Sequence, residues 1–170
     1  LRIFLGLFVQ KYEIGDSMAS FKIHSLSELS QKELYEILAL RADVFIVEQK
    51  CAYQDLDGKD GDSLHARLIE NRKIYAYCRI IPPGVIFEEI SIGRVVTPLN
   101  YRNLGHGKEI MKKSIALCFK LYPNKDILIM AQSYLVNFYE QLGFKIEKNE
   151  FLEDGIPHRW MRLHANMPNQ

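Results

Sequence analysis

The run Asp126–Ala131 (DILIMA) constrains the fold of this chain more than any other segment. Apolar residues follow one another in it, without the alternation of apolar and polar positions that a half-exposed strand shows. A run of this kind is typical of a strand that is covered on both faces. We therefore expect a central sheet with helices packed on both of its sides.

Helical periodicity and capping signals predict the helices. Ser30 and Glu33 form a capping box. The helix that they open places one stripe of residues inward: Leu34, Ile37, Leu38, Arg41, Phe45 and Glu48. A second helix is predicted over residues 105–121. We expect Ser133 to cap a last helix that shares one face among Tyr134, Leu135, Phe138 and Leu142.

Apolar and alternating runs predict the other strands, at residues 21–24, 64–70, 73–81, 89–97, 144–148 and 159–164. Asn71-Arg72 is expected to form a tight hairpin turn between two of them. The chain has no internal repeat and no linker, and 48% of its 170 residues are hydrophobic. These features predict one mixed α+β domain over residues 18–170.

Residues 1–17 are expected to be an N-terminal extension of this domain. Their apolar part, Leu1–Val9, is nine residues long and contains Arg2, whereas a membrane-spanning helix needs roughly 20 apolar residues. The segment also lacks the longer apolar core and small-residue cleavage site of a signal peptide. It is either a stretch from an upstream start or an added strand or packing arm. We expect no membrane association.

Charge and cysteine content exclude several classes of function. Lys and Arg number 22 against 21 Asp and Glu, so the net charge of +1 argues against nucleic-acid binding. Cys51, Cys78 and Cys118 are scattered, which predicts reduced thiols in a cytoplasmic protein and no zinc site. The Asp-rich loop at residues 55–62 resembles a calcium loop but lacks its closing Glu. We expect no metal, and interpret this loop as an acidic lip that would favour a cationic substrate.

The segment Arg102–Gly107 (RNLGHG) is the sharpest chemical signal. It lies between a predicted strand and a predicted helix, so that several backbone N–H groups and the helix dipole would meet at one point. Residues 101–113 carry four basic side chains and one acidic one, a net charge of +3. The spacing fits neither a Walker A loop nor a dinucleotide fingerprint. We predict a phosphate or pyrophosphate site; a plain glycine turn with solvated lysines is the alternative.

Arg102-x-x-Gly105-x-Gly107 resembles the coenzyme A signature of the GNAT superfamily of N-acetyltransferases. Residues 137–144 (NFYEQLGF) are similar to the helix-to-strand segment of that family. Residues 41–57 and 153–158 (EDGIPH) resemble its ElaA-like branch, and the resemblance covers about residues 21–164. It implies a mixed, mostly antiparallel central sheet of about 6–7 strands flanked by about four helices.

The resemblance also implies a cofactor site for acetyl-CoA. In this family the strand before the turn splays from its neighbour, so the pantetheine arm would pair with the free backbone of Val95, Val96 and Thr97. Asn137 would contact the cofactor through its side chain. The pyrophosphate would bind the amides of the turn: Asn103, Leu104, Gly105, His106, Gly107 and Lys108. A backbone N–H near Val95 would stabilise the oxyanion, and Tyr139 would protonate the leaving thiolate. A packed helix aromatic is the alternative for Tyr139.

The base that takes the proton of the amine is not determined by the resemblance. The usual family Glu falls near Ser91 here, and Glu89 lies two residues earlier on the same face. Glu48 is a second candidate, because a carboxylate on an apolar stripe needs a partner or a role. A structural ion pair, or deprotonation through water, stays open for both. For the acceptor we interpret Arg41, His65 and Gln132 as candidate contacts.

These expectations favour an enzyme that transfers an acetyl group from acetyl-CoA to a primary amine by direct attack in a ternary complex. The alternative from another class is a non-catalytic acyl-CoA-binding or regulatory module. The acceptor amine is undetermined, because acceptor loops vary independently of the cofactor frame. Dimers are common in the family, so a homodimer stays open.

Overall fold

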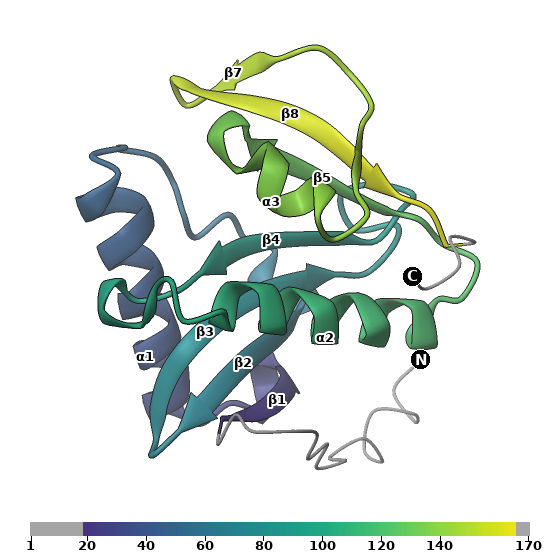
Figure 1. The fold of residues 1–170 in the computed structure, drawn as a ribbon. Coiled ribbons are helices and arrows are strands. Elements are labelled where there is room, and N and C mark those ends of the chain that lie inside the picture. Colours follow the sequence, from purple (N-terminus) through teal and green to yellow (C-terminus); the bar gives the residue numbers. More distant parts are fainter. Residues whose placement is uncertain (1–18, 166–170) are drawn as a thin grey trace.

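The computed structural model describes residues 19–165, which form an α+β domain of two sheets with helices packed on them (Figure 1). The first sheet has the order β1-β2-β3-β4, formed by Ser20–Ser25, Leu64–Glu70, Lys73–Ile81 and Ser91–Val96. The second has the order β5-β8-β6, with β7 also paired to β8; these strands are Ile127–Gln132, Ile156–Leu163, Lys145–Ile146 and Phe151–Glu153. All pairs within the sheets are antiparallel, which confirms the predicted class. The proposed extension at residues 1–17 lies outside the described residues.

Two-residue turns set the register of two hairpins. Asn71 and Arg72 have φ angles of 49° and 63°, the left-handed values that match the twist of a β-hairpin. β2 therefore ends, and β3 begins, at the residues that the sequence predicts. Asp154 and Gly155 form a second turn of this kind, with φ of 50° and 77°. β7 was not predicted, and β8 begins earlier than expected, although an Asp-Gly pair is a strong hairpin signal.

Within the described residues, a single backbone bridge pairs the two sheets with each other. Ile90 and Ile127 form a parallel bridge: Ile90 N donates to Asp126 O (3.0 Å) and Leu128 N donates to Ile90 O (2.9 Å). After this bridge β4 and β5 diverge (Figure 1). The edge of β4 that faces β5 is therefore left without a strand partner, as the family resemblance implies.

The first helix changes its geometry halfway. The capping box is confirmed: Glu33 N donates to Ser30 Oγ (3.3 Å), and Ser30 N donates to the Glu33 carboxylate (3.0 Å). α1 covers Gln31–Arg41 and continues as a π-helix, η3, over Ala42–Glu48. Because the π-helix is wider, the predicted single stripe does not extend through it. Arg41 is buried, whereas Glu48 is exposed.

The other helices cover the opposite side of the sheets. α2 (His106–Leu121) packs on β2, β3 and β4 and buries Ile110, Met111, Ser114 and Cys118. α3 (Val136–Glu140) follows a 3₁₀ turn at Ser133–Leu135. The prediction that Ser133 caps this helix is wrong, because its hydroxyl donates to the Glu150 carboxylate (2.6 Å). Tyr134, expected on the inner face, is exposed.

β5 was expected to be covered on both faces, and this is only partly correct. Ile127, Ile129 and Ala131 lie in the main core together with buried residues of α2 and β8. Met130, on the other face, is 43% exposed. It borders the cleft that opens between β4 and β5, so part of the strand faces that cleft and not a helix.

Candidate functional site: a cleft between β4 and β5

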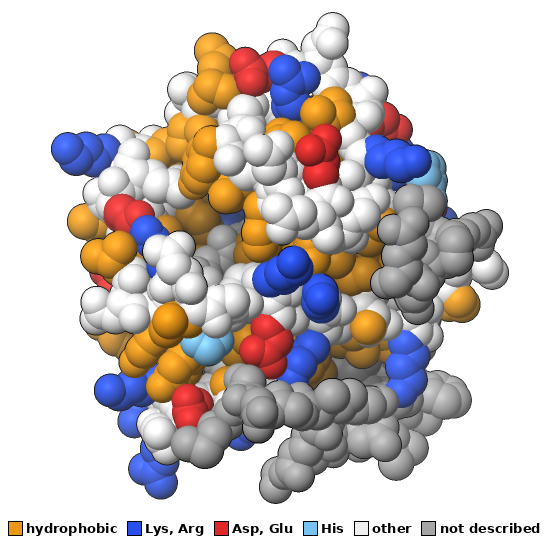
Figure 2. Space-filling view, viewed as in Figure 1, with side chains coloured by type: hydrophobic (Ala, Val, Ile, Leu, Met, Phe, Trp, Pro, Cys, Tyr) orange, Lys and Arg blue, Asp and Glu red, His pale blue; other side chains and the backbone are white. Residues whose placement is uncertain are grey.

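A cleft of about 840 Å³ opens where β4 and β5 diverge. Its walls come from both strands, from η3 and the loop after it, from the turn before α2, and from the β7–β8 turn. Lys and Arg side chains gather over α2 on the face shown in Figure 2. Twelve of the residues singled out from the sequence line the cleft: Glu48, Val95, Val96, Thr97, Arg102, Asn103, Gly105, His106, Gly107, Lys108, Gln132 and Tyr139.

The turn before α2 has the geometry of an anion site. Asn103 and Gly105 have φ angles of 61° and 86°, so the chain reverses sharply before the helix begins at His106. The first helical hydrogen bond runs from Glu109 N to Gly105 O (3.0 Å), which leaves the preceding amides without a partner inside the helix. A Cβ built on Gly105 meets no heavy atom within 4 Å, so there is room beside the turn. These free amides and this space fit a phosphate group.

β4 carries a bulge at residues that line the cleft. Arg79 pairs with Gly93, but Tyr77 pairs with Val96, so β4 contains one residue more than β3 over this stretch. Arg94 has a φ of 52°, a left-handed conformation that glycine usually supplies in bulges of the G1 type. Val95 follows directly and lines the cleft together with Val96 and Thr97.

Tyr139 closes the inner wall. Its side chain is 7% exposed and packs edge to face on Phe138 and Phe144, with ring centroids 5.1 and 5.8 Å away. Burial raises the pKa of Tyr139 well above its ordinary value, so the phenol stays protonated at neutral pH. Its hydroxyl makes no hydrogen bond to another residue of the described part of the chain. The residue is thus both a packed aromatic and a phenol that borders the cleft.

Glu48 is tied to the turn before α2. Arg102 Nη1 and Nη2 donate to its two carboxylate oxygens at 2.6 and 2.7 Å, and Arg102 Nε donates to Thr97 O (3.1 Å). The hydrogen bond from Arg102 lowers the pKa of Glu48 below its ordinary range. Next to this pair, Gln132 Nε2 donates to Gln49 Oε1 (3.2 Å). The end of η3 is therefore connected to both walls of the cleft.

The comparisons with known proteins agree with this geometry. The acetyltransferase (GNAT) domain family matches residues 26–165. The chain belongs to the GNAT family. It is 41% identical to protein ElaA of Escherichia coli over 134 residues, which are 78% of this chain and 88% of ElaA.

Two solved structures are similar to this chain over most of its length. The crystal structure of Escherichia coli ElaA aligns with a TM-score of 0.80 and 38% identity, covering 85% of this chain and 99% of ElaA. An acyl-CoA N-acyltransferase from Pseudomonas aeruginosa aligns with a TM-score of 0.79 and 35% identity, covering 84% of this chain and 97% of that chain. These matches support the ElaA-like branch and an acyl transfer function.

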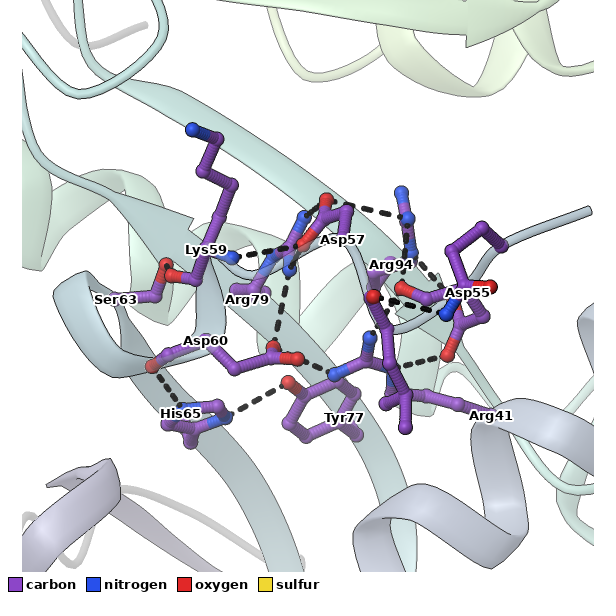
Figure 3. Close-up of polar contacts among 12 residues, drawn as sticks. Arg41, Asp55, Asp57, Lys59, Asp60, Ser63, His65, Tyr77, Arg79 and Arg94 are labelled. Carbon is purple, nitrogen blue, oxygen red and sulfur yellow. Dashed lines mark hydrogen bonds and ion pairs between the residues drawn. The ribbon is translucent and has the colours of Figure 1, made fainter.

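The Asp-rich loop is a neutral ion-pair cluster in this GNAT domain, not an acidic lip. Figure 3 shows the Arg/Asp cluster, which we define as Arg41, Arg79, Arg94, Asp55, Asp57 and Asp60. Each carboxylate pairs with two of the guanidinium groups at 2.6–3.4 Å. The guanidinium groups hold the pKa values of all three aspartates below their ordinary range against the opposing effect of burial. Three positive and three negative charges cancel, so these three aspartates add no net attraction for cations.

Five of the predicted site residues lie outside the lining of the cleft. Arg41 is fully buried and bound to Asp55 and Asp60, and we withdraw it as an acceptor contact. His65 is also fully buried, and its two ring nitrogens lie 2.9 Å from Tyr77 Oη and 3.1 Å from Asp60 O. Burial lowers the pKa of His65, so this histidine is neutral and structural.

Glu89 does not line the cleft and pairs with Arg162 (2.9 Å) beside the junction of the two sheets. Asn137 is exposed on α3, and the Leu104 side chain points to solvent, so only backbone contacts are left to Leu104.

Two arginines of the cleft were missed by the sequence reasoning. Arg79 and Arg94 both line the cleft, and each interrupts an otherwise apolar strand. A guanidinium in such a strand needs carboxylate partners, and the Asp-rich loop holds four of them close together. This signal was present in the sequence. Within residues 19–165, no cluster of His, Cys, Asp and Glu could hold a metal ion, and no helix has the length and apolarity needed to cross a membrane.

Proposed function

We propose that this protein transfers an acetyl group from acetyl-CoA to the nitrogen of a primary amine, with both substrates bound in the cleft at once. The proposal rests mainly on one observation: the free edge of β4 leads directly to the unpaired amides before α2. Family membership supports acyl transfer, and the similarity to an acyl-CoA N-acyltransferase favours a nitrogen acceptor.

Two groups of residues in the cleft would bind different parts of acetyl-CoA. The amides of Asn103–Lys108 would hold the pyrophosphate, assisted by the positive end of the α2 dipole. The backbone of Val95, Val96 and Thr97 would pair with the amide groups of the pantetheine arm. Together they would place the thioester near the bulge of β4, and the thioester supplies the activated acyl group.

The chemical step then requires three groups of the protein. The amine nitrogen attacks the thioester carbonyl, and the N–H of the backbone near Val95 stabilises the negative charge that develops on oxygen. The carbon–sulfur bond breaks, and the Tyr139 hydroxyl gives its proton to the leaving sulfur. A base removes one proton from the amine nitrogen. The base then releases its proton to solvent and Tyr139 takes one up from solvent, so that atoms and charges balance over the cycle.

Glu48 is the base candidate that the cleft retains. It lines the cleft, whereas Glu89 does not, although each of the two carboxylates pairs with an arginine that lowers its pKa. Its pairing with Arg102 weakens it as a base, because the same contact that lowers its pKa also competes for its lone pairs. Deprotonation of the amine through water is the alternative.

Calorimetric titration with acetyl-CoA and CoA, followed by a thiol-release assay with an amine panel, tests the proposal. The panel contains small amines, polyamines, an aminoglycoside and a lysine peptide. Micromolar, salt-sensitive binding and release of CoA thiol with one amine class are expected. Binding without transfer to any amine would favour a non-catalytic acyl-CoA-binding module. Absence of binding by the folded protein would overturn the cofactor assignment.

A cytoplasmic location is part of the proposal. Cys51, Cys78 and Cys118 are all free thiols, and Cys78 and Cys118 are buried. Free thiols persist in a reducing compartment.

A further inference from the structure

We propose that Asp55 is a positioning residue that, through Arg94, holds the β4 bulge in the conformation that directs the Val95 N–H. The inference deepens the proposed function and rests on it. The observation behind it is that the buried carboxylate of Asp55 binds Arg94, the residue before Val95, and that the Arg94 backbone is in the left-handed conformation.

The bulge is a conformation that its residue does not favour. Arg94 has a φ of 52°, and side chains with a Cβ rarely occupy this region, whereas glycine does so readily. β3 offers no partner for the extra residue, because the pairing passes from Arg79–Gly93 to Tyr77–Val96. An interaction of the Arg94 side chain is therefore needed to hold the backbone there.

The Arg94 side chain is held on several sides. Its Nε donates to Asp55 Oδ1 (2.7 Å), and its Nη2 donates to Asp55 O (3.2 Å) and Asp57 Oδ2 (3.4 Å). Its guanidinium also lies 5.5 Å from the centre of the Tyr53 ring. A guanidinium group that donates hydrogen bonds to three oxygen atoms has little freedom to rotate.

Asp55 is itself buried and held by several hydrogen bonds. It is 6% exposed, and Arg41 Nε donates to its Oδ2 (2.9 Å) while Arg41 Nη2 donates to its carbonyl oxygen (3.0 Å). Tyr53 Oη donates to its Oδ1 (2.8 Å). Arg41 is fully buried at the end of α1, so the anchor of the bulge reaches into the helix layer (Figure 3).

The direction of the Val95 N–H depends on this anchor, because the peptide between Arg94 and Val95 turns with the Arg94 backbone. In an extended Arg94, the strand would continue without the bulge and this peptide would rotate. Asp55 thus acts at a distance on the group that we assign to the oxyanion. It touches neither acetyl-CoA nor the amine in this assignment.

Two substitutions of Arg94 test the mechanism. Arg94→Ala and Arg94→Gly both remove the clamped side chain, but only glycine tolerates a φ of 52° without strain. We expect the glycine variant to keep a kcat about fivefold above that of the alanine variant. In an ordinary strand position glycine is the more damaging residue, so this order is diagnostic. Equal kcat values, or a higher kcat for alanine, would overturn the inference.

Asp55→Asn, with Asp62→Asn as control, tests the anchor. Asp62 is exposed in the same loop and has no ion pair within residues 19–165. We expect Asp55→Asn to lower kcat about tenfold per folded molecule while the Kd for CoA changes less than threefold, and Asp62→Asn to match the wild type. An Asp55→Asn variant with a lower Tm and an unchanged kcat has a structural role only, which contradicts the proposal. If that variant does not fold, the two Arg94 variants decide.

A readout that needs no turnover separates this inference from the proposed function. We would record the backbone amide resonances of residues 94–97 by ¹⁵N NMR in the wild type and both Asp variants. Shifts of these resonances in Asp55→Asn alone support the anchor even if the wild type transfers nothing. Unmoved resonances overturn it even if the wild type is an active acetyltransferase.

Discussion

Glu48 and Arg102 form a two-pronged ion pair, at 2.6 and 2.7 Å, that joins the end of η3 to the turn before α2. Both side chains are partly exposed, so the pair contributes little to stability. Its position matters more, because it sets a carboxylate beside amides that we assign to a pyrophosphate. The pair thus connects Glu48, the proposed base, to the turn that we propose binds acetyl-CoA.

Substitution Glu48→Gln should separate catalysis from stability at this pair. If Glu48 is the base, kcat falls about 100-fold, the typical contribution of a positioned general base. The free energy of unfolding should change by less than about 1 kcal/mol, because exposed ion pairs contribute little. Steady-state kinetics and urea unfolding measure the two quantities. Glu109→Gln is the control, because Glu109 is a partly exposed glutamate in the first turn of α2 that also forms an ion pair, with Lys113 (3.0 Å). An unchanged kcat would leave deprotonation to water.

Tyr139→Phe removes the proposed proton donor and keeps the ring in place. We expect kcat to fall about tenfold to 100-fold while the Kd for CoA stays within a factor of two. Because burial raises the pKa of Tyr139, its ionisation should not limit the wild-type rate below about pH 10. Tyr134→Phe is the matched control: this tyrosine also lines the cleft but is exposed. Equal loss in both variants, or none in Tyr139→Phe, would contradict the assignment.

The two glycines of the cofactor turn should respond differently to alanine. Gly105 has a φ of 86°, so Gly105→Ala strains the turn and should cost about 1 kcal/mol of unfolding free energy. Gly107 lies in the first turn of α2, where a Cβ would meet Thr97 Oγ1 at 3.6 Å and Phe138 Cζ at 3.9 Å, both ordinary contacts. Gly107→Ala should therefore leave stability equal or improved by up to about 1 kcal/mol.

Calorimetric titration of the same two variants with acetyl-CoA then tests whether the cofactor binds close to this turn. A weaker Kd for acetyl-CoA in the stable Gly107→Ala variant indicates that the added methyl group occupies space used by the ligand. An unchanged Kd in both variants would contradict the placement of the pyrophosphate at this turn.

Local signals predicted most of this fold, and long-range ion pairs were the part that they did not predict. The capping box at Ser30 and the turn at Asn71 depend on neighbours within a few residues, so the sequence shows them directly. The partners of Asp55 lie 14 and 39 residues away, at Arg41 and Arg94. Nothing in the Asp-rich loop itself indicates whether its charges face solvent or guanidinium groups. The same limit explains why Arg41 was interpreted as an acceptor contact.

In the cleft, too, local features could be predicted from the sequence and long-range contacts could not. The turn before α2 was predicted from glycine spacing, because a backbone site depends on local conformation. The ion pair between Glu48 and Arg102 spans 54 residues and was not predicted. The resemblance to a family supplied what periodicity could not, namely the splay of β4 from β5.

Acid should weaken the fold partly through Glu33. Hydrogen bonds from Ser30, with Arg67 nearby at 3.0 Å, lower the pKa of Glu33 to about 2 from an ordinary value of 4.5. Because the folded pKa is the lower one, the carboxylate stabilises the fold above pH 4.5, and this contribution is lost as the pH falls toward about 2. We expect about 1 kcal/mol, since the pair is partly exposed and screened by solvent. Thermal unfolding of the wild type and Glu33→Gln from pH 7 to pH 2 measures it. The Tm difference between them should be largest at pH 7 and should shrink below pH 4.5; a difference that does not depend on pH would show that Glu33 acts through packing and not through its charge.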